Sequence, residues 1–86
     1  MTHHRMTARQ FEIAIEKLGL SQVASAQLVG HDPRSARRWV ADERKVPATV
    51  EIVMRLLLAR KIKPSDLEEV MRQSIEALLK AYGRSK

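Results

Sequence analysis

The sequence predicts an all-α fold of five helices joined by short loops. Apolar residues recur three and four positions apart along most of the chain, which is the spacing of one helix face. Alternating apolar residues and hairpin dipeptides such as Asn-Gly, which indicate strands, do not occur in the sequence. A length of 86 residues fits one small domain.

Residues 7–18 predict the first helix. Four apolar residues are spaced so that they share one helix face: Phe11, Ala14, Ile15 and Leu18. Thr7 is suited to cap the start of this helix, and Gly19 is suited to end it.

A second helix is predicted from Gln22 to about Val29. Ser21 provides its N-cap, and Gly30 ends it, because glycine adopts the left-handed backbone conformation at little cost. The residues expected to face inward are Val23 or Ala24, Leu28 and Val29.

The third helix is expected over 33–40, with Asp32 as N-cap and Pro33 at the first helical position. Its inner face contains Ala36, Trp39 and Val40. Its outer face contains Arg34, Ser35, Arg37 and Arg38. As the only tryptophan, Trp39 is expected to anchor the helix to the core.

Two further helices complete the prediction. The fourth runs from about Pro47 or Ala48 to Arg60, and four apolar residues should place it at the centre of the core: Val50, Val53, Leu56 and Leu57. The fifth runs from about Ser65 to Tyr82, with Gly83 as its stop.

The apolar stripe of the fifth helix is wider than a coiled-coil seam. Its residues are Leu67, Val70, Met71, Ile75, Leu78, Leu79 and Tyr82. Either one edge closes the core and the remainder forms a homodimer interface, or the whole stripe packs on its own domain. The expected division of the chain is a flexible N-terminus (1–6), a core (7–62), a C-terminal helix (63–83) and a tail (84–86).

The charge of the chain favours polyanionic partners. It has 16 basic and 10 acidic residues, a net charge of +6 and a pI near 10.3. The segment 32–63 contains nine basic and four acidic residues, and so carries most of the excess. The alternative reading of such a count is an ordinary solvated basic surface.

Several classes of site are not expected. The chain has no cysteine, and its three histidines are not spaced for a metal site, so we expect neither metal nor cofactor. The serines lack an evident His–carboxylate partner and the glycines form no phosphate loop, so we do not expect an enzyme. No apolar run approaches the roughly 18 residues of a membrane span, and no signal core is present, so we expect a cytoplasmic protein.

Residues 20–47, LSQVASAQLVGHDPRSARRWVADERKVP, suggest two short helices separated by a turn that contains glycine. This segment resembles the helix-turn-helix of lambda-repressor-like (XRE-type) DNA-binding domains, and the similarity covers 7–60. The resemblance implies a five-helix domain, major-groove reading by the helix at 33–40, and usually a twofold dimer on a palindromic operator.

The resemblance also implies which residues bind DNA: Gln22, Arg34, Ser35, Arg37, Arg38, Arg44 and Lys45. His31, a residue of the turn, is expected to lie near the DNA backbone as well. Gln22 would bond a phosphate, and Arg44 and Lys45 would hold the DNA backbone. We assign Arg34 and Arg38 to bases and Arg37 to phosphate, since arginine can pair with guanine through two hydrogen bonds.

Three positions depart from the family pattern. Ser25 stands where an apolar residue is usual, and His31 stands where valine is common. Ala36 replaces a larger aliphatic residue, which should loosen the packing between the two motif helices unless Val23 and Trp39 fill the volume.

The sequence therefore predicts a transcriptional regulator, specifically a small repressor, that binds double-stranded DNA as a homodimer. Two alternatives remain. One is an adaptor that keeps the helix-turn-helix shape but docks an acidic protein partner through its basic face. The other is a DNA-binding protein without sequence preference, which would show a steep dependence on salt.

Overall fold

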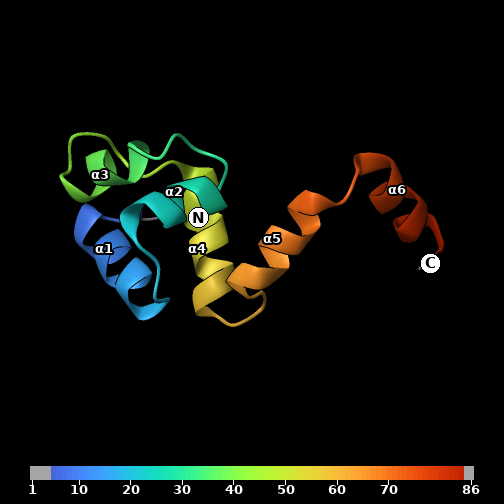
Figure 1. The fold of residues 1–86 in the computed structure, drawn as a ribbon. Coiled ribbons are helices and arrows are strands. Elements are labelled where there is room, and N and C mark those ends of the chain that lie inside the picture. The colour runs from blue at the N-terminus through green and yellow to red at the C-terminus, as the bar shows by residue number, and fades with distance from the viewer. Residues whose placement is uncertain (1–4, 85–86) are drawn as a thin grey trace.

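The computed structural model describes residues 5–84, and the regular elements within this range are all helices (Figure 1). Their bounds are α1 Ala8–Lys17, α2 Gln22–Leu28, α3 Ser35–Val40, α4 Ala48–Leu58, α5 Pro64–Arg72 and α6 Ile75–Arg84. The all-α prediction is confirmed, although the described residues form six helices where five were expected. His3, His4 and the ends of the expected N-terminus (1–6) and tail (84–86) lie outside the described residues.

The sixth helix arises from a break in the expected C-terminal helix. Gln73 is extended, with ψ at 146°, and the Ser74 hydroxyl then accepts the backbone N–H of Ala77 at 3.1 Å. Serine caps a new helix in this way more favourably than it continues an old one. Gly83 lies inside α6, so its predicted role as the stop of the helix was wrong.

Helices α1 to α4 enclose the core, and Trp39 lies within it (Figure 1). The buried apolar residues are Phe11, Ala14, Ile15, Ala26, Ala36, Trp39, Val46, Val50, Met54 and Leu57. The predicted inner face of α1 is confirmed. On α4 the prediction was partly wrong: Leu56 is exposed, whereas Met54 and Glu51 are buried.

Helix α2 turns its small residues, not its large ones, toward α3. Ser25, Ala26 and the facing Ala36 are fully buried, whereas Val23 is 51% exposed and fills no volume in the core. The Ser25 hydroxyl donates to the carbonyl of Gln22 at 2.8 Å, so its burial leaves no unpaired polar atom. Small side chains let α2 and α3 approach closely, so Ala36 does not loosen their packing.

The first four helices end in the same way, with a residue in the left-handed region that closes a Schellman motif. In α2, for example, the N–H groups of Gly30 and His31 donate to the carbonyls of Gln27 and Ala26 at 3.1 and 2.9 Å. Gly19 and Gly30 were predicted in this role. Asp42 and Arg60 adopt it as well, with φ at 61° and 62°.

The start of α3 differs from the prediction. The carboxylate of Asp32 accepts the N–H of Arg34 at 2.8 Å, and the N–H of Ser35 donates to the Asp32 carbonyl at 2.9 Å. These bonds form a tight turn over 32–35, and regular helix begins only at Ser35. The expected helix over 33–40 is therefore two residues too long at its start.

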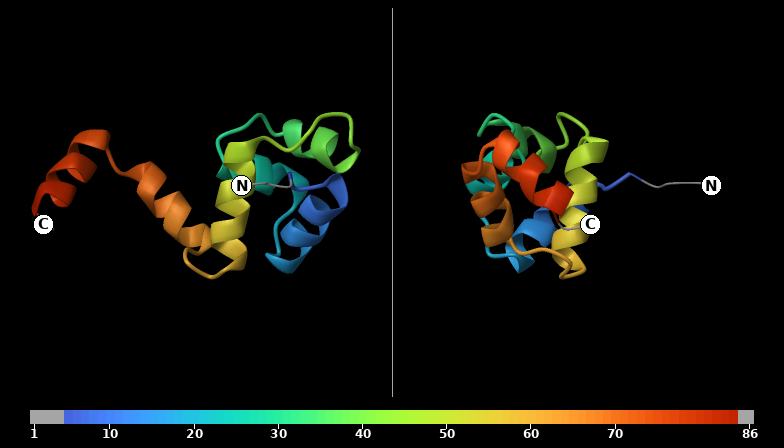
Figure 2. Two further views of the ribbon diagram at one scale, coloured as in Figure 1. Left: turned by 180° about the vertical axis from the view of Figure 1, so that it is seen from behind. Right: turned by 90° about the vertical axis from the view of Figure 1, so that its right-hand side faces the viewer.

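Helices α5 and α6 form an arm that leaves the body formed by α1–α4, as the views in Figures 1 and 2 show. Leu67 of α5 packs against the core, whereas Met71, Ile75 and Leu79 are 67–77% exposed. The radius of gyration is 14.4 Å, against about 12 Å for a compact chain of this length. The expected stripe thus does not pack as a whole on its own domain.

Among residues 5–84, no helix combines the length and the apolar character that crossing a membrane requires.

One residue of the core carries a charge. Glu51 of α4 is 1% exposed. Its carboxylate accepts the backbone N–H of Met6 at 2.9 Å and the Nε–H of Arg55 at 2.8 Å. The buried charge is therefore paired, and it attaches the chain before α1 to α4.

We predict that Glu51→Ala lowers the free energy of unfolding by about 1–3 kcal/mol, because it removes a buried acceptor for Met6 and Arg55. Urea denaturation would measure the change. The matched control is Glu12→Ala, which removes the exposed pair with Arg9 and should cost less than about 1 kcal/mol. Equal effects of the two substitutions would contradict the role given to Glu51.

Candidate nucleic-acid interface

Helix α3 separates its residues into a buried and an exposed face. Ala36 and Trp39 are buried and Val40 is half-buried. Arg34, which immediately precedes the helix, and Arg37 and Arg38 within it are exposed, and Ser35 is half-buried. The outward placement agrees with the sequence prediction. Because the helix has only six residues, its position depends on the buried face.

The chain after α3 folds back over the end of the helix. The N–H groups of Glu43 and Arg44 both donate to the carbonyl of Arg38, at 2.9 and 3.3 Å. Asp42 makes this reversal possible with its positive φ of 61°. The reversal brings the loop cations Arg44 and Lys45 beside the arginines of the helix.

A cavity of about 210 Å³ lies between α3 and this loop. Its lining contains five of the eight predicted site residues, together with Trp39 and Pro47: His31, Ser35, Arg38, Arg44 and Lys45. Three of these side chains are permanently or normally cationic, and Ser35 can donate or accept a hydrogen bond. The arrangement suits a ligand with clustered anionic oxygens.

His31 is held at one wall of this cavity. Its backbone N–H donates to the carbonyl of Ala26 at 2.9 Å, and its ring packs edge-to-face on Trp39, with centroids 5.1 Å apart. The ring is half-buried. The imidazole thus supports Trp39 as well as lining the cavity.

Arg34 lies outside the cavity and is engaged by its neighbour. Its Nε donates to one oxygen of Asp32 at 3.2 Å and its Nη2 to the other at 3.4 Å. The side-chain and backbone hydrogen bonds from Arg34 lower the pKa of the Asp32 carboxyl, and the same carboxylate raises the pKa of Arg34. The pair is exposed, so its chief effect is to orient the guanidinium rather than to stabilise the fold.

The cavity lining also excludes Arg37 and Gln22. Arg37 is exposed on α3. Gln22 is the first residue of α2, follows the capping serine Ser21 and is half-buried. The structure therefore groups the predicted residues into a cavity set and an outer set.

A second cationic region, which the sequence did not predict, lies at the start of α1. A cavity of about 480 Å³ is lined by Arg5, Arg9, Arg44 and Lys45, among others. The Arg5 guanidinium donates to the carbonyl of Val46, which holds the chain before α1 against the loop. The sequence shows the charges of Arg5 and Arg9 but not their place, because this contact joins residues 41 positions apart.

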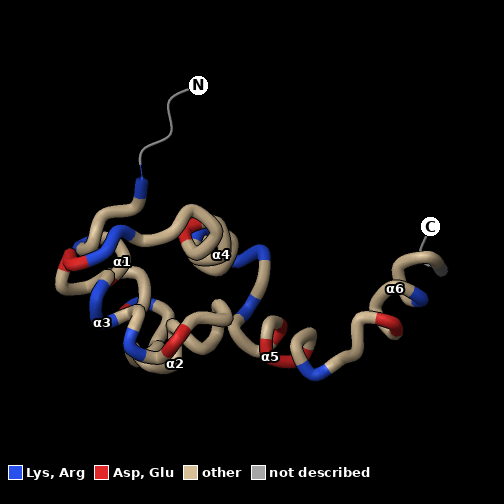
Figure 3. The backbone as a smooth tube through the Cα atoms, turned by 90° about the horizontal axis from the view of Figure 1, so that it is seen from above, with Lys and Arg blue, Asp and Glu red and all other residues tan. Residues whose placement is uncertain are grey.

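Figure 3 shows lysine and arginine positions along α3, the loop after it and the chain leading into α1, and acidic positions both in that loop and on α5. The acidic residues of α5 are Asp66, Glu68 and Glu69. The two cavities share Arg44 and Lys45 and so form one basic surface. Within residues 5–84, no group of three His, Asp or Glu side chains is arranged to hold a metal ion.

Comparison of the chain with protein-family models, with curated proteins and with solved structures gave no match.

We predict that the Asp32 carboxyl titrates below its ordinary pKa, and that Arg34→Ala raises that pKa toward the ordinary value. Because the pKa of Asp32 is depressed in the folded state, the pair with Arg34 contributes to the stability of the fold above the unfolded-state pKa. This contribution to stability is lost as the pH falls through the folded-state pKa. Carbon-detected NMR titration of the aspartates would measure it. The control, Arg37→Ala, should leave the Asp32 titration unchanged, and an ordinary pKa in the unmodified protein would contradict the pairing.

Proposed function

We propose that this protein is a sequence-specific, double-stranded DNA-binding transcriptional regulator that places α3 in the major groove. The observation that carries the proposal is the two-faced α3, with Ala36 and Trp39 buried and Arg34, Arg37 and Arg38 exposed. A helix whose inner face is packed on the core can present hydrogen-bond donors on its outer face to the edges of DNA bases.

The arrangement around α3 supports the same proposal. Helices α2 and α3 contact each other, Ala26 and Ala36 are both buried in the core, and the turn between the two helices contains Gly30. Two short contacting helices joined by such a turn support a helix-turn-helix. The order of α1 to α4 is compatible with the lambda-repressor-like domains that the sequence resembles, and α6 is an addition to the five helices that the resemblance implies.

The cavities refine the roles of the arginines. Arg38 shares its cavity with Arg44 and Lys45, and three converging cations suit a phosphate better than a base edge. Arg34 and Arg37 lie outside the cavity and are exposed. We therefore assign Arg34 and Arg37 to base reading and Arg38 to the phosphate backbone, which reverses the sequence-based roles of Arg37 and Arg38.

The region at the start of α1 would lengthen the backbone contact. Arg5 and Arg9 adjoin Arg44 and Lys45, so a DNA strand that follows the basic surface would meet cations from both ends of the domain's sequence. Each neutralised phosphate releases counterions and adds affinity without sequence information. Bound at an operator, a protein of this size would act as a repressor by occupying the site.

A second candidate function is supported by the exposed apolar residues of the arm. Ile75, Leu79 and Tyr82 of α6 are 67–73% exposed, which is typical of a surface that meets another protein. An adaptor would use this surface together with the basic face for an acidic partner, and would show no preferred DNA sequence.

Selection from random duplex DNA at near-physiological salt tests the proposal. We expect one enriched motif, arranged as an inverted repeat if two copies bind about 34 Å apart. Arg34→Ala with Arg37→Ala should erase the preference, at about 1–3 kcal/mol for each lost base contact. Arg38→Ala should weaken binding to all sequences alike and reduce its salt dependence.

Arg72 is an exposed arginine on α5, and Arg72→Ala is therefore the matched control, which should leave the selected DNA motif unchanged. Absence of enrichment by the folded protein would overturn the proposal in favour of the adaptor or of non-specific binding. Unchanged selection by the Arg34→Ala, Arg37→Ala variant would show that α3 is not the reading helix.

A further inference from the structure

The cavity between α3 and the loop after it contains several cations and no carboxylate. We call it the α3–loop cavity, and its volume is about 210 Å³. The polar side chains that line it are those of His31, Ser35, Arg38, Arg44 and Lys45. The acidic residues of the same loop, Asp42 and Glu43, are not part of the lining. Because neighbouring cations repel one another, the cavity favours an anionic ligand.

The polar groups of this cavity are not used within the fold. In the part of the chain that the structure describes, neither ring nitrogen of His31 has a hydrogen-bond partner, and the cationic side chains of the cavity form no ion pair. Other arginines differ in this respect. Arg34 is paired with Asp32. Arg55 is paired with the buried Glu51. The donors of the α3–loop cavity are therefore available to a ligand.

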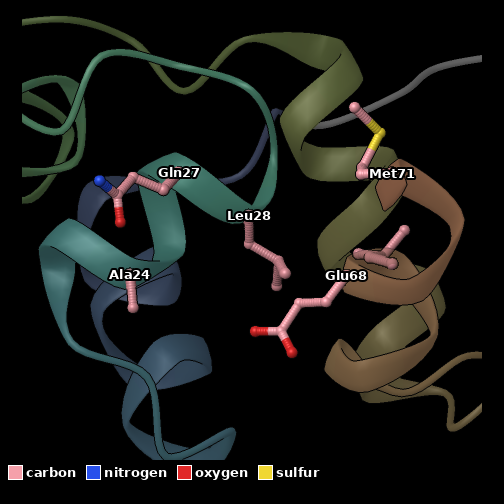
Figure 4. A pocket seen from close by; sticks show the side chains of 6 residues that line it. Ala24, Gln27, Leu28, Glu68 and Met71 are labelled. Atoms are coloured by element: carbon pink, nitrogen blue, oxygen red, sulfur yellow. The ribbon is translucent and has the colours of Figure 1, made fainter. Parts of the chain in front are cut away.

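Two other cavities lack this combination of charges. The cavity of about 280 Å³ between α2 and α5 has no cation in its lining, and Figure 4 shows Glu68 reaching into it from the side opposite Leu28. The cavity of about 350 Å³ between α1 and α4 has Lys17 in its lining, but also the carboxylate of Glu51. An anion would thus meet a carboxylate in both of them but not in the α3–loop cavity.

His31 is the residue of the α3–loop cavity whose charge can change near neutral pH. Histidine gains or loses a proton between about pH 5 and pH 8, whereas arginine and lysine stay charged there. The position of the residue is fixed on two sides. Its backbone N–H donates to the carbonyl of Ala26 at 2.9 Å, and its ring packs edge-to-face on Trp39 with centroids 5.1 Å apart.

The charged groups around the ring of His31 are mainly those of the cavity itself. Helix α2, which ends just before it, contains no titratable residue. The carboxylate of Asp32, the next residue, accepts hydrogen bonds from the backbone and the side chain of Arg34. The charged residues that share the cavity with the ring are Arg38, Arg44 and Lys45. A proton on His31 therefore adds a fourth cation to this cluster.

An anion in the cavity and a proton on His31 stabilise each other. The anion favours the charged imidazolium over the neutral ring. The imidazolium also donates hydrogen bonds from both ring nitrogens, whereas the neutral ring donates from one. Because such coupling is reciprocal, the proton strengthens the binding of the anion by the same factor as the anion strengthens the binding of the proton.

We infer that the α3–loop cavity holds a phosphate group, and that His31 takes up a proton from solvent as the phosphate binds. The inference rests on the proposed function in one respect, which is that the phosphate belongs to the DNA backbone. A backbone phosphate keeps its single negative charge throughout this pH range, so the proton resides on the imidazole. Binding of DNA then tightens as the pH falls.

The first experiment measures the dissociation constant for a duplex at constant ionic strength between about pH 8 and pH 6. The affinity of the unmodified protein should rise as the pH falls, by up to about tenfold per pH unit, which is the limit for uptake of one proton. His31→Gln keeps a hydrogen-bond donor but cannot become charged, so most of this rise should disappear.

The matched control is the double variant His3→Gln, His4→Gln, which removes the other two histidines of the chain and should keep the full pH dependence. The terminal amino group also titrates near neutral pH, but it is common to all the proteins, so the difference between them reports on His31. Circular dichroism would verify that His31→Gln is folded, since this substitution removes the ring that packs on Trp39.

The second experiment uses no DNA and no substitution at His31. In the double variant His31 is the sole histidine, so one imidazole signal can be followed by NMR against pH. Sulfate serves as the probe, because it is a divalent anion whose charge does not change in this range. The pH at which His31 is half-protonated should rise by about one unit in saturating sulfate, compared with chloride at equal ionic strength.

The two experiments separate the inference from the proposed function. An unmoved His31 titration in sulfate would overturn the inference, and so would a pH dependence of DNA binding that His31→Gln retains. In either case sequence-selective binding of DNA would leave the proposed function standing. A sulfate-dependent titration of His31 without binding of DNA at any pH would support the phosphate site, with free phosphate as its ligand, and overturn the proposed function.

Discussion

Burial of Trp39 is the interaction on which the rest of the fold depends. Its ring packs edge-to-face on Phe11 of α1, with centroids 5.3 Å apart, and on His31 in the turn before α3. One side chain thus connects α1, the turn and α3. Because the six residues of α3 would not stay helical alone, this packing and that of Ala36 determine the direction in which the arginines of α3 point.

The parts of the fold that could be predicted are those decided by a few adjacent residues. Thr7 and Ser21 cap their helices, and Gly19 and Gly30 end them, because these preferences are local. The inner face of α2 was misjudged because it depends on a partner. Ser25 and Ala26 are buried, as is the small Ala36 of the contacting α3, and Val23 is left outside although it is more apolar than Ser25.

The candidate site was predictable to a similar degree. Spacing alone placed the α3 arginines opposite Trp39, and charge indicated Arg44 and Lys45. The cavities could not be foreseen, since they require the reversal at Asp42 and the contact of Arg5 with Val46. The break at Gln73 was missed for another reason: an apolar stripe that continues on both sides of a serine gives no sign that the helix restarts there.

The uneven distribution of charge has a consequence for the rate at which partners meet. Cations are concentrated on α3, its loop and the start of α1, although Asp42 and Glu43 lie in the same loop, whereas α5 carries three carboxylates and one arginine (Figure 3). A polyanion is attracted most strongly to the end that carries the α3 cations, so the protein is turned toward it before contact is made. The longest extent of the molecule is 43 Å, whereas charges in physiological salt act over about 8 Å. This electrostatic orientation is therefore weak in physiological salt and becomes stronger as the salt concentration is lowered. Ionic strength should then change the association rate more than the lifetime of the complex.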